Sequence, residues 1–162
     1  TRRFVTEMEV AAHDLGARNA SFADPYGLSA KNAATARDMG LIAARIFTDP
    51  RLLPAWACTE RTLNIQGKRP RAVALKTSLE ILGDEPVIGA KTGSYVSKGI
   101  FNLVTAWRAP NGQTIVGEVL GAKSDAARYA EMRGFIEAAP KDFEQLRGPA
   151  VAAEPPPTSG CN

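Results

Sequence analysis

The residues best placed to do chemistry are Lys91, Thr92, Gly93 and Ser94, which follow one another at the end of a predicted strand. Lysine supplies a positive charge, and the threonine and serine hydroxyls supply hydrogen bonds. Glycine leaves space where a ligand or another backbone can approach a strand closely. The run could therefore form part of a binding or catalytic site at a strand edge. An ordinary lysine at a strand end has the same appearance, and the triplet Lys-Thr-Gly alone arises often by chance.

Other residue types that carry chemistry give weaker patterns. Two cysteines and one histidine are too few for a Cys/His zinc site or a disulfide-dense scaffold, so we expect no metal and no cofactor. We interpret His13 as a surface residue and do not expect Cys58 and Cys161 to pair, because one lies in an apolar stretch and the other in an expected flexible tail. Three aspartates have simple local roles in a helix end, a turn and a cap: Asp14, Asp24 and Asp38.

The N-terminal third of the chain predicts two amphipathic helices. The first spans residues 2–15 and ends before Gly16, with apolar residues at helical spacing: Phe4, Met8, Ala12 and Leu15. The second begins after Thr35, a good N-cap, and Asp38 in its first turn suits the helix dipole. Its apolar stripe consists of Met39, Ile42, Ala43, Ile46 and Phe47. Asp49-Pro50 ends it.

The middle of the chain is less regular. Leu52, Leu53 and Trp56 predict a buried short helix or turn. Residues 62–65 and 72–75 could form two short strands on either side of a basic turn. No aromatic residue lies in that turn, so we interpret it as solvated and do not expect nucleic-acid binding.

From residue 87 the pattern becomes that of strands, over 87–92, 100–108 and 115–120. Asn111-Gly112 joins the last two strands, and Asn-Gly is a strong hairpin signal. Ser124 then caps a final helix with one apolar face: Tyr129, Met132, Ile136 and Ala139. The order of helices, antiparallel meander and covering helix predicts the α+β class.

The composition of the 162 residues is globular, with 44% hydrophobic and 23% charged residues. We expect one domain over residues 1–147, followed by a Pro-rich tail or linker at 148–162 that holds four of the eleven prolines. No apolar run approaches the roughly 20 residues that a membrane span needs. The net charge of +3 is a small imbalance.

Four ordered sets of residues match family motifs. They are Phe4-Val5, Met8, Ala12 and Leu15-Gly16; Phe22, Asp24-Pro25 and Gly27-Leu28; Thr35-Ala36 and Asp38-Met39; and Val87, Gly89 and Lys91-Thr92-Gly93. The sets resemble motifs of the D-alanyl-D-alanine carboxypeptidases, the low-molecular-mass penicillin-binding proteins of serine peptidase family S11. The resemblance covers about residues 4–138 and implies a penicillin-binding-protein/serine β-lactamase-like transpeptidase fold. Two places depart from the family: Glu9 replaces an Asn, and Lys76-Thr77-Ser78 replaces Asn-Thr-Asn.

The resemblance implies an enzyme that trims peptidoglycan stem peptides through an acyl-enzyme and that β-lactams acylate. It implies that Lys91 is catalytic, with its charge beside a serine of a second motif and the substrate's terminal carboxylate. Thr92 would donate its hydroxyl to that carboxylate, and Gly93 would leave room for the peptide. The backbone N–H of Ser94 would be one oxyanion-hole donor. The location implied is periplasmic or extracytoplasmic.

Two of the family's three motifs, S-x-x-K and S-x-N, are absent from the sequence. In the family both lie upstream of the first helix. We therefore interpret the chain as a C-terminal portion without a nucleophile, inactive alone, and expect it to pair with the missing N-terminal segment or a second chain. Two alternatives stay open: a non-catalytic remnant or binding module that packs on a partner chain, and a serine β-lactamase fragment. The first two matching sets favour the carboxypeptidase.

Overall fold

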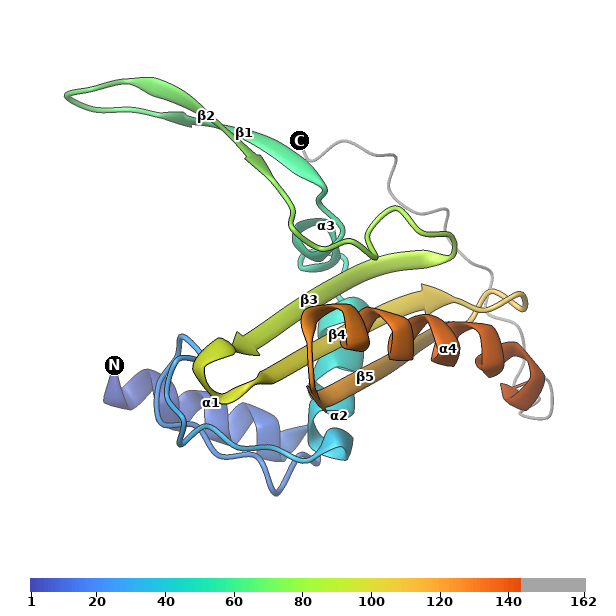
Figure 1. Ribbon diagram of the computed structural model, residues 1–162. Coiled ribbons are helices and arrows are strands. Elements are labelled where there is room, and N and C mark those ends of the chain that lie inside the picture. The colour runs from blue at the N-terminus through green and yellow to red at the C-terminus, as the bar shows by residue number, and fades with distance from the viewer. Residues whose placement is uncertain (144–162) are drawn as a thin grey trace.

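A three-stranded antiparallel sheet forms the centre of the computed structural model, which describes residues 1–143. Its strands are β3 (Val87–Tyr95), β4 (Ile100–Arg108) and β5 (Thr114–Ala122), in the order β3-β4-β5. Helix α4 (Asp125–Phe143) covers one face, and α2 (Ala36–Phe47) crosses the other (Figure 1). The predicted α+β order of helices, meander and covering helix is confirmed.

The face toward α4 holds the larger core. Leu103 and Trp107 of β4 and Val119 of β5 pack against Tyr129 and Met132 of α4, and all five are nearly inaccessible to solvent. The Trp107 ring lies over Gly117, where a β-carbon would come within 2.8 Å of the indole. A glycine on β5 therefore makes room for the largest side chain of this core.

The face toward α2 holds a smaller core. Ala43 and Phe47 of α2 are buried against Ala106 of β4. Phe47 also lies over Gly89 of β3, where a β-carbon would meet the ring at 2.9 Å. Trp56, at the end of the short helix α3 (Leu53–Trp56), makes an edge contact with Phe47 at 6.2 Å between ring centroids.

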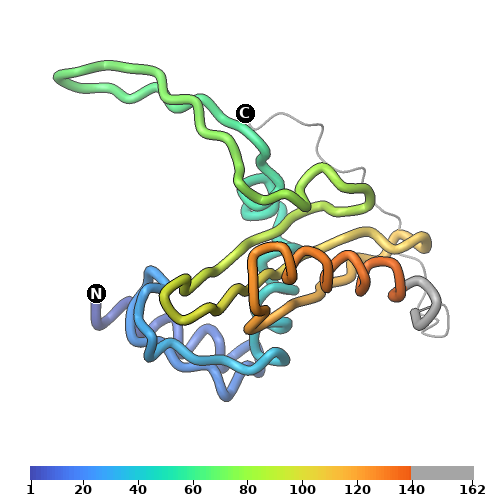
Figure 2. The backbone as a smooth tube through the Cα atoms, viewed as in Figure 1, coloured from blue at the N-terminus to red at the C-terminus, as the bar shows by residue number. Residues whose placement is uncertain are grey.

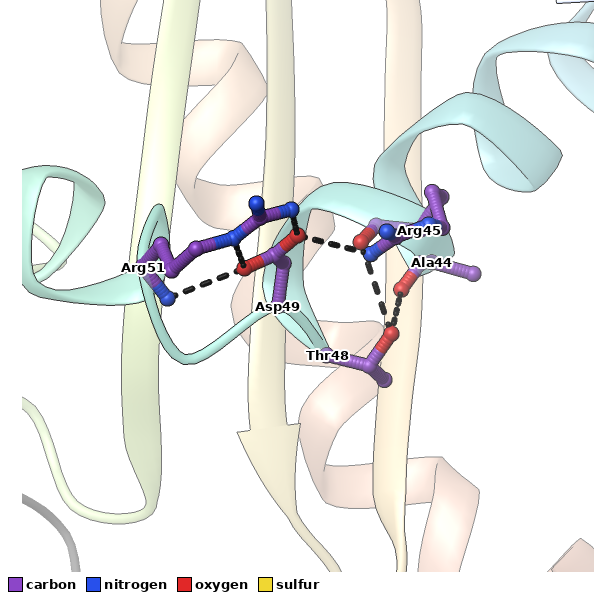
Figure 3. Close-up of polar contacts among 5 residues, drawn as sticks. All are labelled: Ala44, Arg45, Thr48, Asp49 and Arg51. Carbon is purple, nitrogen blue, oxygen red and sulfur yellow. Dashed lines mark hydrogen bonds and ion pairs between the residues drawn. The ribbon is translucent and has the colours of Figure 1, made fainter.

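Polar contacts fix both ends of α2. At the N-terminus, Thr35 and Asp38 form the two halves of a capping box. At the C-terminus, the buried Asp49 accepts hydrogen bonds from Arg51 Nε at 3.0 Å and Nη2 at 2.7 Å, and from Arg45 Nη1 at 3.0 Å (Figure 3). The hydrogen bonds from Arg51 hold the pKa of Asp49 well below its usual range. The carboxylate therefore stays charged and ties the chain after α2 to the helix.

Helix α1 (Arg2–Asp14) packs through small residues. Ala12 is its buried residue, and it forms a cluster with Ala17 and Ala20, against which Phe22, Ala34 and Ile42 pack. The predicted stripe is only partly correct, because Phe4 is 55% exposed. Helix α1 therefore buries only one residue fully in the core.

Residues 60–76 form a two-stranded ribbon, β1 (Glu60–Ile65) and β2 (Arg71–Lys76), which stands away from the body of the molecule (Figure 2). Both strands are longer than predicted, because the pairing also includes polar residues at their ends. Helix α3 is present as predicted, but none of its residues is buried. Cys58 is disulfide-bonded, contrary to the expectation from its apolar surroundings.

The other predicted elements lie close to their expected positions. Strand β3 continues three residues beyond the prediction, through Gly93 to Tyr95, and β5 is longer at both ends. Ser124 caps α4, with its Oγ accepting from the Ala127 N–H at 3.0 Å. The predicted tail at 148–162 and the domain boundary at 147 lie outside the described residues.

We predict that Gly89→Ala lowers the free energy of unfolding by about 1–3 kcal/mol, because the new β-carbon overpacks the Phe47 ring. Gly134→Ala in α4 is the matched control. Apart from the adjoining backbone of α4, no atom lies within 4 Å of the place that its methyl group would take, so it should add up to about 1 kcal/mol through helix propensity. Urea unfolding of the three chains measures both. Equal effects of the two substitutions would contradict the close contact at Gly89.

Candidate functional site

The run from Lys91 to Ser94 lies in the second half of β3, an outer strand of the described sheet. An outer strand presents unpaired N–H and C=O groups along its open side. Because side chains alternate along a strand, Lys91 and Gly93 belong to the face toward α2, whereas Thr92 and Ser94 belong to the face toward α4. A ligand at this edge would therefore meet the predicted residues from both faces of the sheet.

A cavity of about 470 Å³ lies beside this part of β3. Lys91, Thr92 and Gly93 line it together with Asn102 of β4 and Glu118 of β5. The opposite wall comes from the segment between α1 and α2 and from the first turns of α2: Phe22, Gly27, Asn32, Ala33, Ala34 and Met39. The structure thus brings three of the four predicted residues into one cavity, and Ser94 is not among its lining residues.

Lys91 of β3 and Glu118 of β5 lie in one line of paired residues across the three strands. Lys91 lies opposite Val104, and Val104 lies opposite Glu118. Residues opposite one another in antiparallel strands project from the same face, so Lys91 and Glu118 lie on the cavity side, about 10 Å apart as two strand spacings require.

Glu118 is held in an environment that favours its neutral form. Burial raises the pKa of the Glu118 carboxyl to about 7, and a backbone hydrogen bond from Gly40 of α2 only partly opposes this. Its Oε2 is buried without a hydrogen-bond partner among the described residues. Gly40 allows this close approach, because a β-carbon there would lie 3.2 Å from Oε1.

Arg128 of α4 holds the Ser94 side chain from the face of the sheet that α4 covers. The buried Arg128 donates from Nη1 to Ser94 Oγ at 2.8 Å and to the Asn102 carbonyl at 3.2 Å, and it forms an ion pair with Asp125. Its guanidinium also lies 5.8 Å from the centre of the Phe101 ring. The hydroxyl of Ser94 is therefore oriented toward α4, while the Lys91 ammonium donates to the carbonyl of Thr92.

The segment that forms the opposite wall is ordered by Asp24. Its carboxylate accepts hydrogen bonds from the backbone N–H groups of Tyr26, Leu28 and Ser29, and from Asn32 Nδ2 at 3.1 Å. Burial opposes the charged form of Asp24, but these hydrogen bonds outweigh it and lower the pKa. The charged carboxylate thereby fixes the conformation of the loop, which supports the sequence interpretation of Asp24 as a turn residue.

The two departures from the family motifs have different positions. Glu9 accepts a hydrogen bond from the Phe22 N–H at 3.3 Å and so contacts the wall of the cavity. Lys76, Thr77 and Ser78 line a separate hollow at the base of the ribbon, together with Thr59 and Glu60. Only the first departure lies next to the cavity that contains Lys91.

Sequence reasoning missed Arg128 and Glu118. Glu118 left a signal, because it is a lone acid in the middle of a strand rich in β-branched residues. Arg128 comes directly before Tyr129, which belongs to the predicted apolar face of α4. No local sequence pattern links Arg128 to Ser94. Among the residues that the structure describes, no cluster of three or more His, Cys, Asp or Glu could hold a metal ion, and no helix is long and apolar enough to cross a membrane.

The sheet with a helix on each face and a Lys-Thr-Gly sequence on its outer strand match the fold of penicillin-binding DD-peptidases of known structure. The family model described as D-alanyl-D-alanine carboxypeptidase, peptidase S11, matches residues 1–124. The chain therefore belongs to the S11 family, as the sequence motifs indicated. No curated protein sequence matches it.

Solved structures agree with this assignment. The DD-transpeptidase of Streptomyces K15 is 27% identical with a TM-score of 0.76, over 83% of this chain and 52% of that one. Penicillin binding protein 5 from Haemophilus influenzae is 26% identical with a TM-score of 0.71, over 83% of this chain and 38% of that one. A D-alanyl-D-alanine carboxypeptidase from Mycobacterium tuberculosis H37Rv, 20% identical, shares the fold with a TM-score of 0.67, over 93% of this chain and 56% of that one. The chain spans about half the length of the K15 enzyme.

We predict that Glu118 makes the chain less stable as pH rises. Its pKa of about 7 in the folded state exceeds the 4.5 of an unperturbed group, so the folded state binds the proton more tightly and its contribution to stability is lost between these values. Glu118→Gln should match the wild type below pH 4.5 and exceed it above pH 7, by on the order of 1 kcal/mol at this partly exposed position.

Urea unfolding of both chains across this pH range provides the measurement. Glu131→Gln, at an exposed position on α4, is the control for the loss of one acidic side chain without a change in burial. A difference between Glu118→Gln and the wild type that stays constant across this pH range would contradict the effect of burial on Glu118.

Proposed function

We propose that the chain is the C-terminal part of a serine-type D-Ala-D-Ala carboxypeptidase that trims peptidoglycan stem peptides outside the cytoplasmic membrane. Family membership supports the enzyme class. The observation that carries the assignment to this site is the position of Lys91, Thr92 and Gly93 at the open edge of β3, beside a cavity large enough for the end of a peptide.

The residues of β3 have separate roles in this proposal. The Lys91 ammonium leaves the carbonyl of its own strand to bind the terminal carboxylate of the peptide, and the Thr92 hydroxyl donates to the same carboxylate. Charge-assisted hydrogen bonds of this kind are about twice as strong as neutral ones. Gly93 lets the peptide backbone lie against the strand edge. Arg128 keeps the Ser94 side chain turned away from the cavity, which leaves the Ser94 N–H as a donor to the developing oxyanion.

The nucleophile does not come from this chain, because none of its serines begins an S-x-x-K motif. In the whole enzyme a serine attacks the D-Ala-D-Ala peptide bond, the last D-Ala leaves with a proton on its amine, and water hydrolyses the acyl-enzyme. The chain alone would then bind the substrate terminus without cleaving it. The absence of the motif equally favours the second candidate, a non-catalytic binding module.

Benzylpenicillin separates the chain's own chemistry from that of a partner. We predict that intact mass spectrometry of the chain as prepared, before and after incubation with benzylpenicillin, shows no acyl adduct on it, because no activated serine is present. An adduct on this chain would mean that a nucleophile exists in it and that the inactive assignment is wrong. An adduct on a co-purifying chain would support a split enzyme.

Peptide binding tests the roles of β3 directly. We predict that a peptide ending in D-Ala-D-Ala shifts the backbone amide NMR signals of β3, and that Lys91→Gln weakens this binding about tenfold or more, the loss expected for one charged hydrogen bond. Lys98→Gln, an exposed lysine beyond β3, is the matched control and should leave binding unchanged. The same peptide with a C-terminal amide should bind the wild type as weakly as the peptide with a free carboxylate binds Lys91→Gln.

Equal binding of the acid and amide peptides would contradict the carboxylate role of Lys91. Shifts confined to elements other than β3 would contradict the site itself. A peptide that binds without any partner chain becoming acylated by benzylpenicillin would favour the binding module over the enzyme.

A further inference from the structure

The β1–β2 ribbon has one apolar and one polar face. In its register Arg61 lies opposite Leu75, Leu63 opposite Val73, and Ile65 opposite Arg71. Opposite residues project from the same side of a ribbon, so one side carries four aliphatic residues bounded by two arginines. We call these four the apolar face of the ribbon: Leu63, Ile65, Val73 and Leu75. The other side carries Glu60, Thr62, Asn64, Ala72, Ala74 and Lys76.

The apolar face is open to solvent. Leu63, Ile65 and Leu75 are 41%, 39% and 48% exposed. Within residues 1–143, neither strand packs extensively against any other helix or strand, and the ribbon projects away from the sheet and helices (Figure 1). An isolated two-stranded hairpin is marginally stable in water. An aliphatic surface on such a hairpin therefore indicates that it meets a partner.

The charge around the apolar face is almost entirely positive. The stretch 59–77 holds five basic residues and one acid: Arg61, Lys68, Arg69, Arg71 and Lys76, with Glu60. Lys68 and Arg69 lie in the exposed turn at the tip, and the single acid lies on the polar side at the base. A partner that covers the apolar face would thus meet positive charge at the tip and along the sides.

We propose that the ribbon docks on an anionic lipid surface, with its apolar face among the acyl chains and its basic residues at the lipid phosphates. Amphipathic helices with apolar residues on one face and Lys or Arg on the other bury their apolar face about 5–10 Å into the lipid interface, and the ribbon likewise has an apolar face bordered by basic residues. Juxtamembrane basic residues are attracted by the negative surface potential of such a membrane. The proposal is independent of the acyl-transfer assignment, because the ribbon contributes no residue to the cavity beside Lys91.

Lipid fits these side chains better than a protein or a nucleic acid. The ribbon has no aromatic residue, whereas protein-binding hot spots are rich in Trp and Tyr and single-stranded nucleic acids stack on aromatic platforms. Aliphatic side chains and a basic rim are what a headgroup boundary accommodates. Insertion of the apolar face and attraction of the basic residues to the lipid phosphates would both contribute to binding by the ribbon.

Tryptophan placed on each side of the ribbon reports which face enters the lipid. Leu63→Trp lies on the apolar face and Asn64→Trp on the polar face, one residue away. With vesicles of phosphatidylcholine and phosphatidylglycerol, the emission of Leu63→Trp should shift to the blue relative to the wild type, which carries two tryptophans of its own. Asn64→Trp should shift little. Neither should respond to vesicles of phosphatidylcholine alone.

Sedimentation with the same vesicles tests the two contributions separately. Lys68→Gln with Arg69→Gln should weaken binding about tenfold or more, given the loss of two basic residues at the surface. Leu63→Thr with Leu75→Thr should weaken it as well, and threonine keeps the strand propensity. The matched controls remove two exposed lysines elsewhere, Lys98→Gln with Lys123→Gln, or two exposed valines, Val10→Thr with Val96→Thr. Far-ultraviolet circular dichroism checks that every variant folds like the wild type.

The proposal is overturned if the wild type does not bind the anionic vesicles, or if the controls lose binding as much as the ribbon variants. Binding that survives Leu63→Thr with Leu75→Thr, or an equal blue shift from both tryptophan positions, would exclude insertion of the apolar face. If soluble heparin binds the chain and prevents its sedimentation at equimolar lipid phosphate, the basic tip recognises polyanions in general, and the lipid assignment is wrong.

Discussion

The close packing of α2 on the sheet, with Phe47 over Gly89 of β3, is the constraint on which the rest of the structure depends. Phe47 can pack this close to the sheet only because Gly89 has no side chain and Ala106 has a small one. This contact sets the distance between the helix and the strand two residues before Lys91. Interiors packed at this density do not deform smoothly. The position of the open edge of β3 is therefore fixed by a contact outside the cavity.

The same principle operates on the other face. Gly117 accepts the Trp107 ring, and α4 closes over it with Tyr129 and Met132. From α4, Arg128 reaches Ser94 and the Asn102 carbonyl, which joins the cover helix to the end of β3. The strand that carries Lys91 is thus held by an aromatic contact on one side and by a guanidinium on the other. Its outer edge has no described strand partner and stays open to a ligand.

Much of the fold could be predicted from the sequence because its signals are local. Thr35 and Asp38 lie three residues apart, and the sequence predicts an N-cap and an acidic first turn there, which the structure joins in a capping box. Asn111-Gly112 predicts the turn between β4 and β5 in the same way. The exposure of Phe4 could not be predicted, because an apolar residue at helical spacing predicts burial only if another element covers that face. The extent of the ribbon depends on pairing between its strands, and a single strand pattern does not show it.

The sequence predicts the residues of the candidate site that are consecutive. It does not predict those that are distant in sequence and that only the folded chain brings together. Lys91 to Ser94 form one motif, whereas Glu118 reaches the cavity through two strand pairings and Arg128 reaches Ser94 through the packing of α4. These two distant residues lie on opposite faces of the sheet, Glu118 on the face toward α2 and Arg128 on the face toward α4. Burial raises the pKa of the acid to about 7 and so reduces its negative charge at neutral pH, while the ion pair of Arg128 with Asp125 balances the charge of the guanidinium. In this arrangement Lys91 is the one cationic side chain among the described residues that line the cavity, so an anionic terminus entering from the open edge has a single cationic group to meet.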